Sequence, residues 1–212
     1  GKAVLEAFLA RKDEVAGVFC APEKPGAKAD PVRVAAEEKK LKVFQFKSLR
    51  DAEAHEALKS LKADIGIMAY VLQFAPDTLV KIPRLGTIQY HPSLLPKYRG
   101  PSSINWPIIR GNTRTGLTIF RPTEGLDEGP MVLQKECDIG PDETIGDVYF
   151  NKLFPMGVKA MLEAADLIPP EDEVLLKKSG VAAVFTPKDY EVNRILTDLV
   201  KIVEAAAGKN AA

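Results

Sequence analysis

A histidine and an aspartate occupy positions from which they could together move a proton. His91 follows the β-type run Gly86–Tyr90 and opens the segment HPSLLPKYRG. Asp127 lies in the glycine-bracketed segment GLDEG, after a second β-type run, Thr115–Arg121. Ligands of α/β proteins gather at the carboxyl ends of strands, and we expect both residues there. An imidazole beside a carboxylate can orient a water, transfer a proton and stabilise an oxyanion, although a single histidine at a strand end can also be purely structural.

The elements that must position this pair follow one another as alternating strands and helices. Strands are expected at Glu14–Cys20, Lys42–Phe46, Asp64–Tyr70, Gly86–Tyr90, Thr115–Arg121 and Met131–Cys137. Helices are expected at Gly1–Lys12, from the N-cap Asp30 to Glu38, at Leu49–Leu61, at Pro101–Arg110 and at Thr144–Leu167, the last with a kink at Pro155. This order predicts an α/β fold with an open, mainly parallel, doubly wound sheet.

Composition excludes several classes of protein. Among 212 residues, 29 Lys and Arg balance 29 Asp and Glu, so charge gives no indication of binding to nucleic acid or to a membrane surface. No apolar run approaches the about 20 residues that span a bilayer, and no signal peptide is visible. Cys20 and Cys137 lack metal-site or redox spacing, which favours two reduced, buried thiols in a cytoplasmic protein. The sequence has no GxGxxG motif, so nothing supports dinucleotide binding.

A longer string around the pair narrows the interpretation. HPSLLPKYRGPSSINWPIIRG, followed by TGLTIFRPTEGLDEGPMVLQKE, resembles the formyltransferases that use 10-formyltetrahydrofolate. The resemblance covers residues 1–167 and is greatest to the hydrolase domain of 10-formyltetrahydrofolate dehydrogenases. It implies a Rossmann-like formyltransferase fold, 10-formyltetrahydrofolate as the formyl donor, and a small-molecule folate as the binding partner.

The resemblance also implies roles for individual residues. His91 would donate to the oxyanion or hold the attacking group, and Asp127 would hold a water or act as the base. Transferases of this family have an asparagine two positions before the histidine, as a third catalytic residue that contacts the oxyanion. This chain has Gln89 there, and the extra methylene puts the same amide at a different distance. Substrate-binding residues implied by the family are Met68, Ala69, Tyr70, Leu72, Phe74, Ser93, Thr123 and Gly125.

Some of these residues have a second interpretation. The segment that includes Leu72 and Phe74 could line a pterin pocket with backbone groups or form a core-packing turn. The hydroxyl of Ser93 fits a turn cap better than a nucleophile, because no base lies beside it in sequence. The run Lys97–Arg99 could meet a folate tail or a phosphorylated acceptor, or could be exposed without a specific role.

The two ends of the chain depart from the resembled family. No strand precedes the first helix, where the family has one. Residues 168–206 resemble the last helix–strand–helix of the cobalamin-binding domains of methylmalonyl-CoA mutases, but the chain lacks their Asp-x-His-x-x-Gly motif, so no cobalamin is expected. We therefore expect two parts: a catalytic domain over 1–167 and a flavodoxin-like segment over 168–212, whose strand Val181–Phe185 joins the same sheet.

Two functions from different classes follow. The first is a folate-dependent enzyme that transfers or hydrolyses the formyl group. The second is a non-catalytic hybrid, natural or engineered, of a formyltransferase fragment and a cobalamin-domain fragment. The sequence does not identify the formyl acceptor, but zero net charge and the lack of a basic C-terminal domain argue against tRNA.

Overall fold

The computed structural model describes residues 1–168, 199–201 and 203. The chain divides into two units, Gly1–Ile168 and Pro169–Ala212, and all sheets described here belong to the first. Residues 199–201 and 203 are helical. The expected strand Val181–Phe185 lies outside the described residues, as does most of the expected flavodoxin-like segment.

The strands of the first unit form two sheets. In the smaller one, β1 (Val18–Cys20) pairs in parallel with β2 (Val43–Gln45). The larger has the order β3-β4-β5-β6, with β3 at Gly66–Met68, β4 at Thr87–His91, β5 at Arg114–Phe120 and β6 at Met131–Asp138. Only β3 and β4 are parallel in this sheet, because β5 runs antiparallel to both of its neighbours.

The expected α/β class is therefore confirmed, whereas the single, mainly parallel sheet is wrong. Parallel neighbours need a crossover connection, usually a long helix, and the chain between β4 and β5 has only the short helix α5 (Asn105–Ile109). The strand β5 then turns back directly into β6. Hydrophobic runs identify strands but carry no information on ladder partners, and the ladder of β1 is with β2.

The helices begin and end close to the expected residues. They are α1 (Lys2–Ala10), α2 (Pro31–Glu38), α3 (Ala52–Leu61), α4 (Asp77–Val80), α5, the π-helix η1 (Asp147–Leu153) and α6 (Phe154–Asp166). The expected cap of α2 is confirmed, because the Asp30 side chain accepts a hydrogen bond from the Val32 backbone N–H at 2.9 Å. It satisfies one of the free N–H groups at the start of this helix.

The expected helix over Thr144–Leu167 is divided into two kinds of helix. The π-helix η1 ends at Leu153 and α6 begins at Phe154. Pro155 is therefore the second residue of α6, in a helix that continues directly from η1, and it cannot donate a hydrogen bond to the π-helical turn before it. The irregularity that we expected at Pro155 lies instead in the π-helical turns before it.

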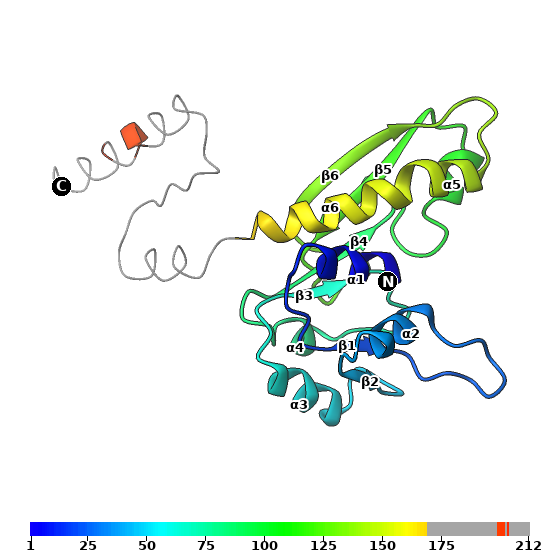
Figure 1. The fold of residues 1–212 in the computed structure, drawn as a ribbon. Helices are drawn as coiled ribbons and strands as arrows, with labels where there is room; N and C mark the ends of the chain where they lie inside the picture. Colours follow the sequence, from blue (N-terminus) through cyan, green and yellow to red (C-terminus); the bar gives the residue numbers. More distant parts are fainter. Residues whose placement is uncertain (169–198, 202, 204–212) are drawn as a thin grey trace. The chain divides into compact units, whose positions relative to one another are not determined.

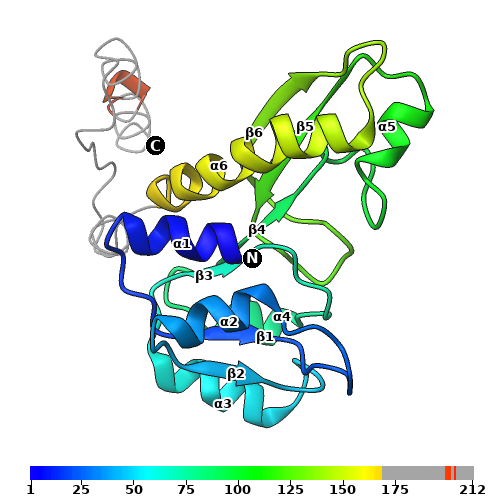
Figure 2. The ribbon, with the colours of Figure 1, turned by 45° about the vertical axis from the view of Figure 1, so that its right-hand side comes forward.

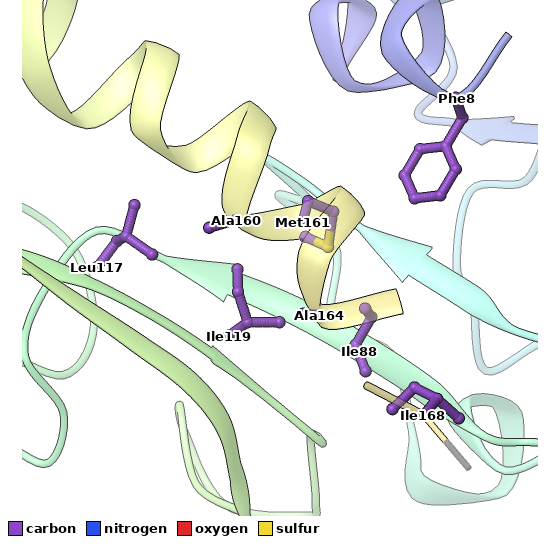
Figure 3. Close-up of a cluster of buried hydrophobic side chains, with 8 residues drawn as sticks. All are labelled: Phe8, Ile88, Leu117, Ile119, Ala160, Met161, Ala164 and Ile168. Atoms are coloured by element: carbon purple, nitrogen blue, oxygen red, sulfur yellow. The ribbon is translucent and has the colours of Figure 1, made fainter. Parts of the chain in front are cut away.

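The core of the unit lies between α6 and the larger sheet. Figures 1 and 2 both show α6 lying along one face of β4, β5 and β6, with α1 beside it. Figure 3 shows the buried side chains between these layers, which are Phe8, Ile88, Leu117, Ile119, Ala160, Met161, Ala164 and Ile168. The alternation of β4 directs Ile88 and Tyr90 into this layer, and therefore directs the residues between and beyond them to the opposite face.

Replacing Ile119 by alanine should destabilise the protein by about 2–5 kcal/mol, because its side chain is fully buried and a cavity would remain. Urea unfolding of the whole chain measures the change. Ile109 is the matched control, since it is 68% exposed and Ile109→Ala removes the same atoms. Equal effects of the two substitutions would contradict the assignment of Ile119 to the core.

Other kinds of site find no support in the part of the chain that is described. No group of three or more His, Cys, Asp and Glu residues could hold a metal ion there. No helix among those residues is long and apolar enough to cross a membrane. Cys20 and Cys137 are free and half-buried, and burial raises the pKa of each thiol, so neither is primed as a nucleophile.

Candidate active site

The strand β4 presents Gln89 and His91 on one face of the sheet. Gln89 and His91 are two positions apart and therefore lie on the same face, while Ile88 and Tyr90 point to the opposite face under α6. The residue paired with His91 on β5 is Thr118, whose hydroxyl donates to the Ser93 carbonyl and fixes the chain that follows His91. The sheet thus holds an amide and an imidazole side by side on a rigid element.

One nitrogen of the His91 ring forms a hydrogen bond with the backbone. Nε2 lies 2.9 Å from the Tyr98 carbonyl oxygen, which can only accept, so Nε2 must carry a hydrogen. The ring itself is buried, with 7% of its side chain exposed. This bond fixes the orientation of the ring and leaves Nδ1 as the nitrogen that can act on another group.

Nδ1 of His91 faces the carboxylate of Asp127. Its distance to Oδ2 is 3.4 Å, and 10% of the Asp127 side chain is exposed. The same Oδ2 accepts the Gly100 backbone N–H at 2.8 Å, while Oδ1 accepts the Gln89 side-chain N–H at 3.3 Å. The expected pair is therefore formed, and Gln89 is the third member of the cluster.

The pair meets for a different reason from the one expected. Because β5 runs antiparallel to β4, the carboxyl ends of these strands lie at opposite edges of the sheet. The loop between β5 and β6, residues 121–130, instead folds back over the face that carries Gln89 and His91, and brings Asp127 to them. A second loop, from Pro92 to Ile104, meets it through the Gly100 N–H.

A proton between Nδ1 and Oδ2 would satisfy both atoms. With Nε2 already protonated, a neutral His91 would point the Nδ1 lone pair at the carboxylate, which is repulsive. A proton on either atom turns this repulsion into a charge-assisted contact. The two side chains are therefore placed so that they could share a proton.

Several residues in the loops of this site adopt backbone conformations that L-residues rarely adopt. Positive φ angles occur at Tyr70, Tyr98, Ser102 and Asp127, in addition to Gly100 and Gly129. Such conformations cost about 1–3 kcal/mol each and persist where surrounding contacts enforce them. At Tyr98 and Asp127 they place the two groups that His91 contacts.

An ion pair joins the two loops beside the carboxylate. Arg99 donates to Glu128, and the neighbouring residues Gly100 and Asp127 form the bond described above. The loops are thus joined by two adjacent contacts. Tyr98 and Gly100 were not expected as site residues; the signal for Gly100 was a glycine directly after a basic turn, which a required positive φ would explain.

Gly129→Ala should disturb Asp127, because a Cβ there would lie 1.8 Å from the Arg121 carbonyl oxygen and φ is 140°. The loop must move, and a displacement of about 1 Å at a catalytic group can cost about 10²-fold in rate. Gly26→Ala is the control, since Gly26 also has positive φ but open space around its Cβ position. A Gly129→Ala protein with normal turnover in an assay of formyl release would show that the loop does not position Asp127.

The residues implied for substrate binding divide by environment. Met68 pairs with Gln89 across the parallel strands β3 and β4, so it lies next to the cluster. Ala69 packs against the core under α6, which leaves only its backbone for a ligand. Tyr70, Leu72 and Phe74 are exposed, at 78%, 80% and 52%. Exposed apolar side chains at a sheet end can form one wall of a ligand site.

The remaining implied residues belong to turns. Ser93 is fully buried and its hydroxyl donates to the Lys97 carbonyl at 2.7 Å, which is the turn-capping role. The hydroxyl of Thr123 donates to the Glu128 carbonyl at 3.1 Å and closes the Asp127 loop. A Cβ at Gly125 would lie 2.1 Å from Glu128 Oε2, so a larger residue there would displace the half-exposed Glu128 side chain.

Comparison with known proteins shows the family of this chain. The family model described as formyl transferase matches residues 2–165. The chain belongs to the formyl transferase family. Mitochondrial 10-formyltetrahydrofolate dehydrogenase of Mus musculus is 42% identical over 173 residues, which cover 79% of this chain and 19% of that protein. The crystal structure of phosphoribosylglycinamide formyltransferase from Bacillus halodurans superposes with a TM-score of 0.63 at 24% identity, covering 84% of this chain and 89% of that one.

A further relative bears on the end of the chain. Cytosolic 10-formyltetrahydrofolate dehydrogenase of Xenopus tropicalis is 38% identical over 198 residues, which cover 91% of this chain and 22% of that protein. The chain thus spans about a fifth of the length of these curated relatives. A match of this extent continues beyond residue 168, so the comparisons give no support to a tail from a cobalamin-binding domain or to a chimera.

Proposed function

We propose that this domain removes the formyl group of 10-formyltetrahydrofolate and passes it to water or to an amine. The observation that carries the proposal is the contact of 3.4 Å between His91 Nδ1 and Asp127 Oδ2, two side chains that are 7% and 10% exposed. A pair of this kind, screened from water, suits proton transfer during acyl transfer.

The reaction needs one proton to move and one negative charge to be held. The acceptor oxygen or nitrogen attacks the formyl carbon, and the carbonyl oxygen becomes an oxyanion. The bond from the formyl carbon to N10 then breaks, and N10 takes the proton that the acceptor released. With water as acceptor the products are formate and tetrahydrofolate; with an amine they are a formamide and tetrahydrofolate.

His91 is the group we assign to the oxyanion. Its Nδ1–H would donate to a charge that develops beside Asp127, while the Nε2 bond to Tyr98 keeps the ring in place. A donor that is already oriented has no reorganisation to complete as the charge develops. The oxyanion is then held by the strand β4 rather than by a loop.

Asp127 is the group we assign to the proton of the acceptor. Its carboxylate is held by Gly100 and Gln89, so it has a fixed position from which to take a proton.

The ligand chemistry also fits a folate. The exposed side chains Tyr70, Leu72 and Phe74 offer apolar surface for a flat aromatic ring system, in the loop that follows β3, the parallel neighbour of β4. We therefore propose a small-molecule folate as the partner. We also propose that the protein is cytoplasmic. With 29 basic and 29 acidic residues, nothing in the net charge attracts nucleic acid.

The proposal is tested by supplying 10-formyltetrahydrofolate to the full chain. Calorimetry should detect micromolar binding, and assays of tetrahydrofolate and formate should detect turnover. Adding amines of increasing size separates transfer from hydrolysis, because a competent amine lowers the formate yield and gains the formyl group. A folded chain that neither binds nor converts the folate would overturn the proposal and favour a protein without catalytic activity.

A further inference from the structure

Two polar side chains lie in a row with His91 across the larger sheet. Thr118 on β5 is in register with His91 on one side and with Gln134 on β6 on the other. Side chains of residues that are in register on neighbouring strands lie on the same face of a sheet. The face that carries His91 therefore also carries a hydroxyl and an amide, neither of which belongs to the cluster described above.

The hydroxyl of Thr118 is the centre of a hydrogen-bond network. It donates to the Ser93 carbonyl at 2.7 Å, and it accepts the Leu95 backbone N–H at 3.1 Å and the Gln134 side-chain N–H at 2.8 Å. A hydroxyl has one hydrogen and two lone pairs, so these three bonds use all of them. The Gln134 amide also donates to the Leu95 carbonyl at 3.1 Å. Because Thr118 is fully buried, removing its hydroxyl would leave buried backbone groups without a partner.

Ser93 connects this network to His91. Its hydroxyl donates to the Lys97 carbonyl at 2.7 Å and so closes the turn that leads to Tyr98. The Tyr98 carbonyl then accepts the hydrogen of His91 Nε2 at 2.9 Å. The orientation of the His91 ring therefore depends on bonds that begin on β5 and β6, outside the cluster that contains Asp127.

We propose that Thr118 and Gln134 are positioning residues for His91. They hold residues 93–98 against the sheet, and the carbonyl at the end of this segment fixes the ring. The effect on turnover rests on the proposed function, whereas the hold on the segment is a property of the protein alone. Neither side chain needs to touch the substrate.

Thr118→Val removes the hydroxyl and keeps the shape of the side chain. The Leu95 amide should then exchange with deuterium about 5-fold to 10-fold faster in the full chain, measured by NMR, because it loses its acceptor. The kcat for 10-formyltetrahydrofolate should fall by up to about 10²-fold with KM little changed, since a displacement of about 1 Å at a catalytic group can cost that much. Thr118→Ser keeps the hydroxyl and should restore both readings.

Thr115→Val is the matched control, because it makes the same chemical change on the same strand. Thr115 is 3% exposed, and its hydroxyl has no hydrogen-bond partner among the residues that the structure describes. This substitution should leave the exchange of the Leu95 amide and kcat unchanged. If Thr115→Val and Thr118→Val had equal effects, the loss of any buried hydroxyl would explain them and the proposal would be wrong.

Gln134→Met removes the amide and keeps the length of the side chain. It should lower kcat less than Thr118→Val, because the Thr118 hydroxyl still holds the Ser93 carbonyl and the Leu95 N–H. Combined with Thr118→Val, it should lower kcat by less than the product of the two single effects, since the two residues share a hydrogen bond. Effects that multiply fully would show that Gln134 acts independently of Thr118, which contradicts the proposal.

The outcomes separate this inference from the proposed function. Normal exchange of the Leu95 amide in Thr118→Val, or faster exchange with a normal kcat, would overturn the inference alone. Faster exchange in Thr118→Val, together with an unsubstituted protein that does not convert 10-formyltetrahydrofolate, would overturn the proposed function and support the hold of Thr118 on residues 93–98.

Discussion

Replacing His91 by alanine should lower the rate of formyl release by about 10²–10³-fold, the typical cost of losing one preorganised oxyanion donor. The ring is held by the Tyr98 carbonyl and faces Asp127, so alanine removes the only side chain that we assign to the oxyanion. Folate affinity should change far less, because His91 acts on a charge that exists only during the reaction. The measurements are steady-state release of tetrahydrofolate and calorimetric binding.

His55→Ala is the control for this substitution. His55 lies on α3, with ring nitrogens near the Asp51 carbonyl and the Thr78 hydroxyl, away from the cluster on β4. It should lose a little stability and keep its turnover. If His91→Ala retained near-normal activity while folding normally, the oxyanion would have to be held elsewhere and the proposed mechanism would be wrong.

The sequence predicted those parts of the fold that depend on local pattern. Asp30 before Pro31 predicted a capped helix, and the side chain caps it. The strand expected at Gly86–Tyr90 is observed as β4, which begins one residue later and also includes His91. These rules need only neighbouring residues, and a single sequence contains them.

The arrangement of the sheets could not be obtained in this way. Whether β5 runs parallel or antiparallel to β4 depends on the path of the chain between them, and the helix expected there, Pro101–Arg110, favoured a parallel crossover that the structure does not have. The ladder between β1 and β2 likewise depends on which strand edges meet. The strands that pair in a sheet can lie far apart in the sequence, and the hydrophobic period of one strand does not indicate its partner.

The sequence predicted which residues form the cluster, but not the path of the chain that brings them together. His91 and Asp127 were identified from their types and segments, but the loop 121–130 brings them together by folding back over the sheet. The contacts that Tyr98 and Gly100 make in the cluster depend on positive φ angles at these two residues. A backbone carbonyl or N–H belongs to every residue, so its use in a site has almost no sequence signal.

Asp127→Asn should stop turnover while folate still binds. Asparagine keeps the shape, and its oxygen can still accept from Gly100 or Gln89, so the loop should stay in place. It cannot take a proton, and losing a positioned base typically costs about 10²–10⁴-fold in rate. Comparing kcat with the calorimetric affinity for 10-formyltetrahydrofolate separates these two effects.

Glu128→Gln is the matched control for that substitution, because it makes the same chemical change at the next residue. Glu128 is paired with Arg99 and its side chain is 48% exposed, so its loss should cost at most about 1 kcal/mol of stability and little activity. If the two variants lost activity equally, the charge of the loop as a whole, and not the base at Asp127, would govern the reaction. Full turnover by Asp127→Asn would reassign Asp127 to the architecture of the loop, leaving His91 without the proton partner that the geometry gives it.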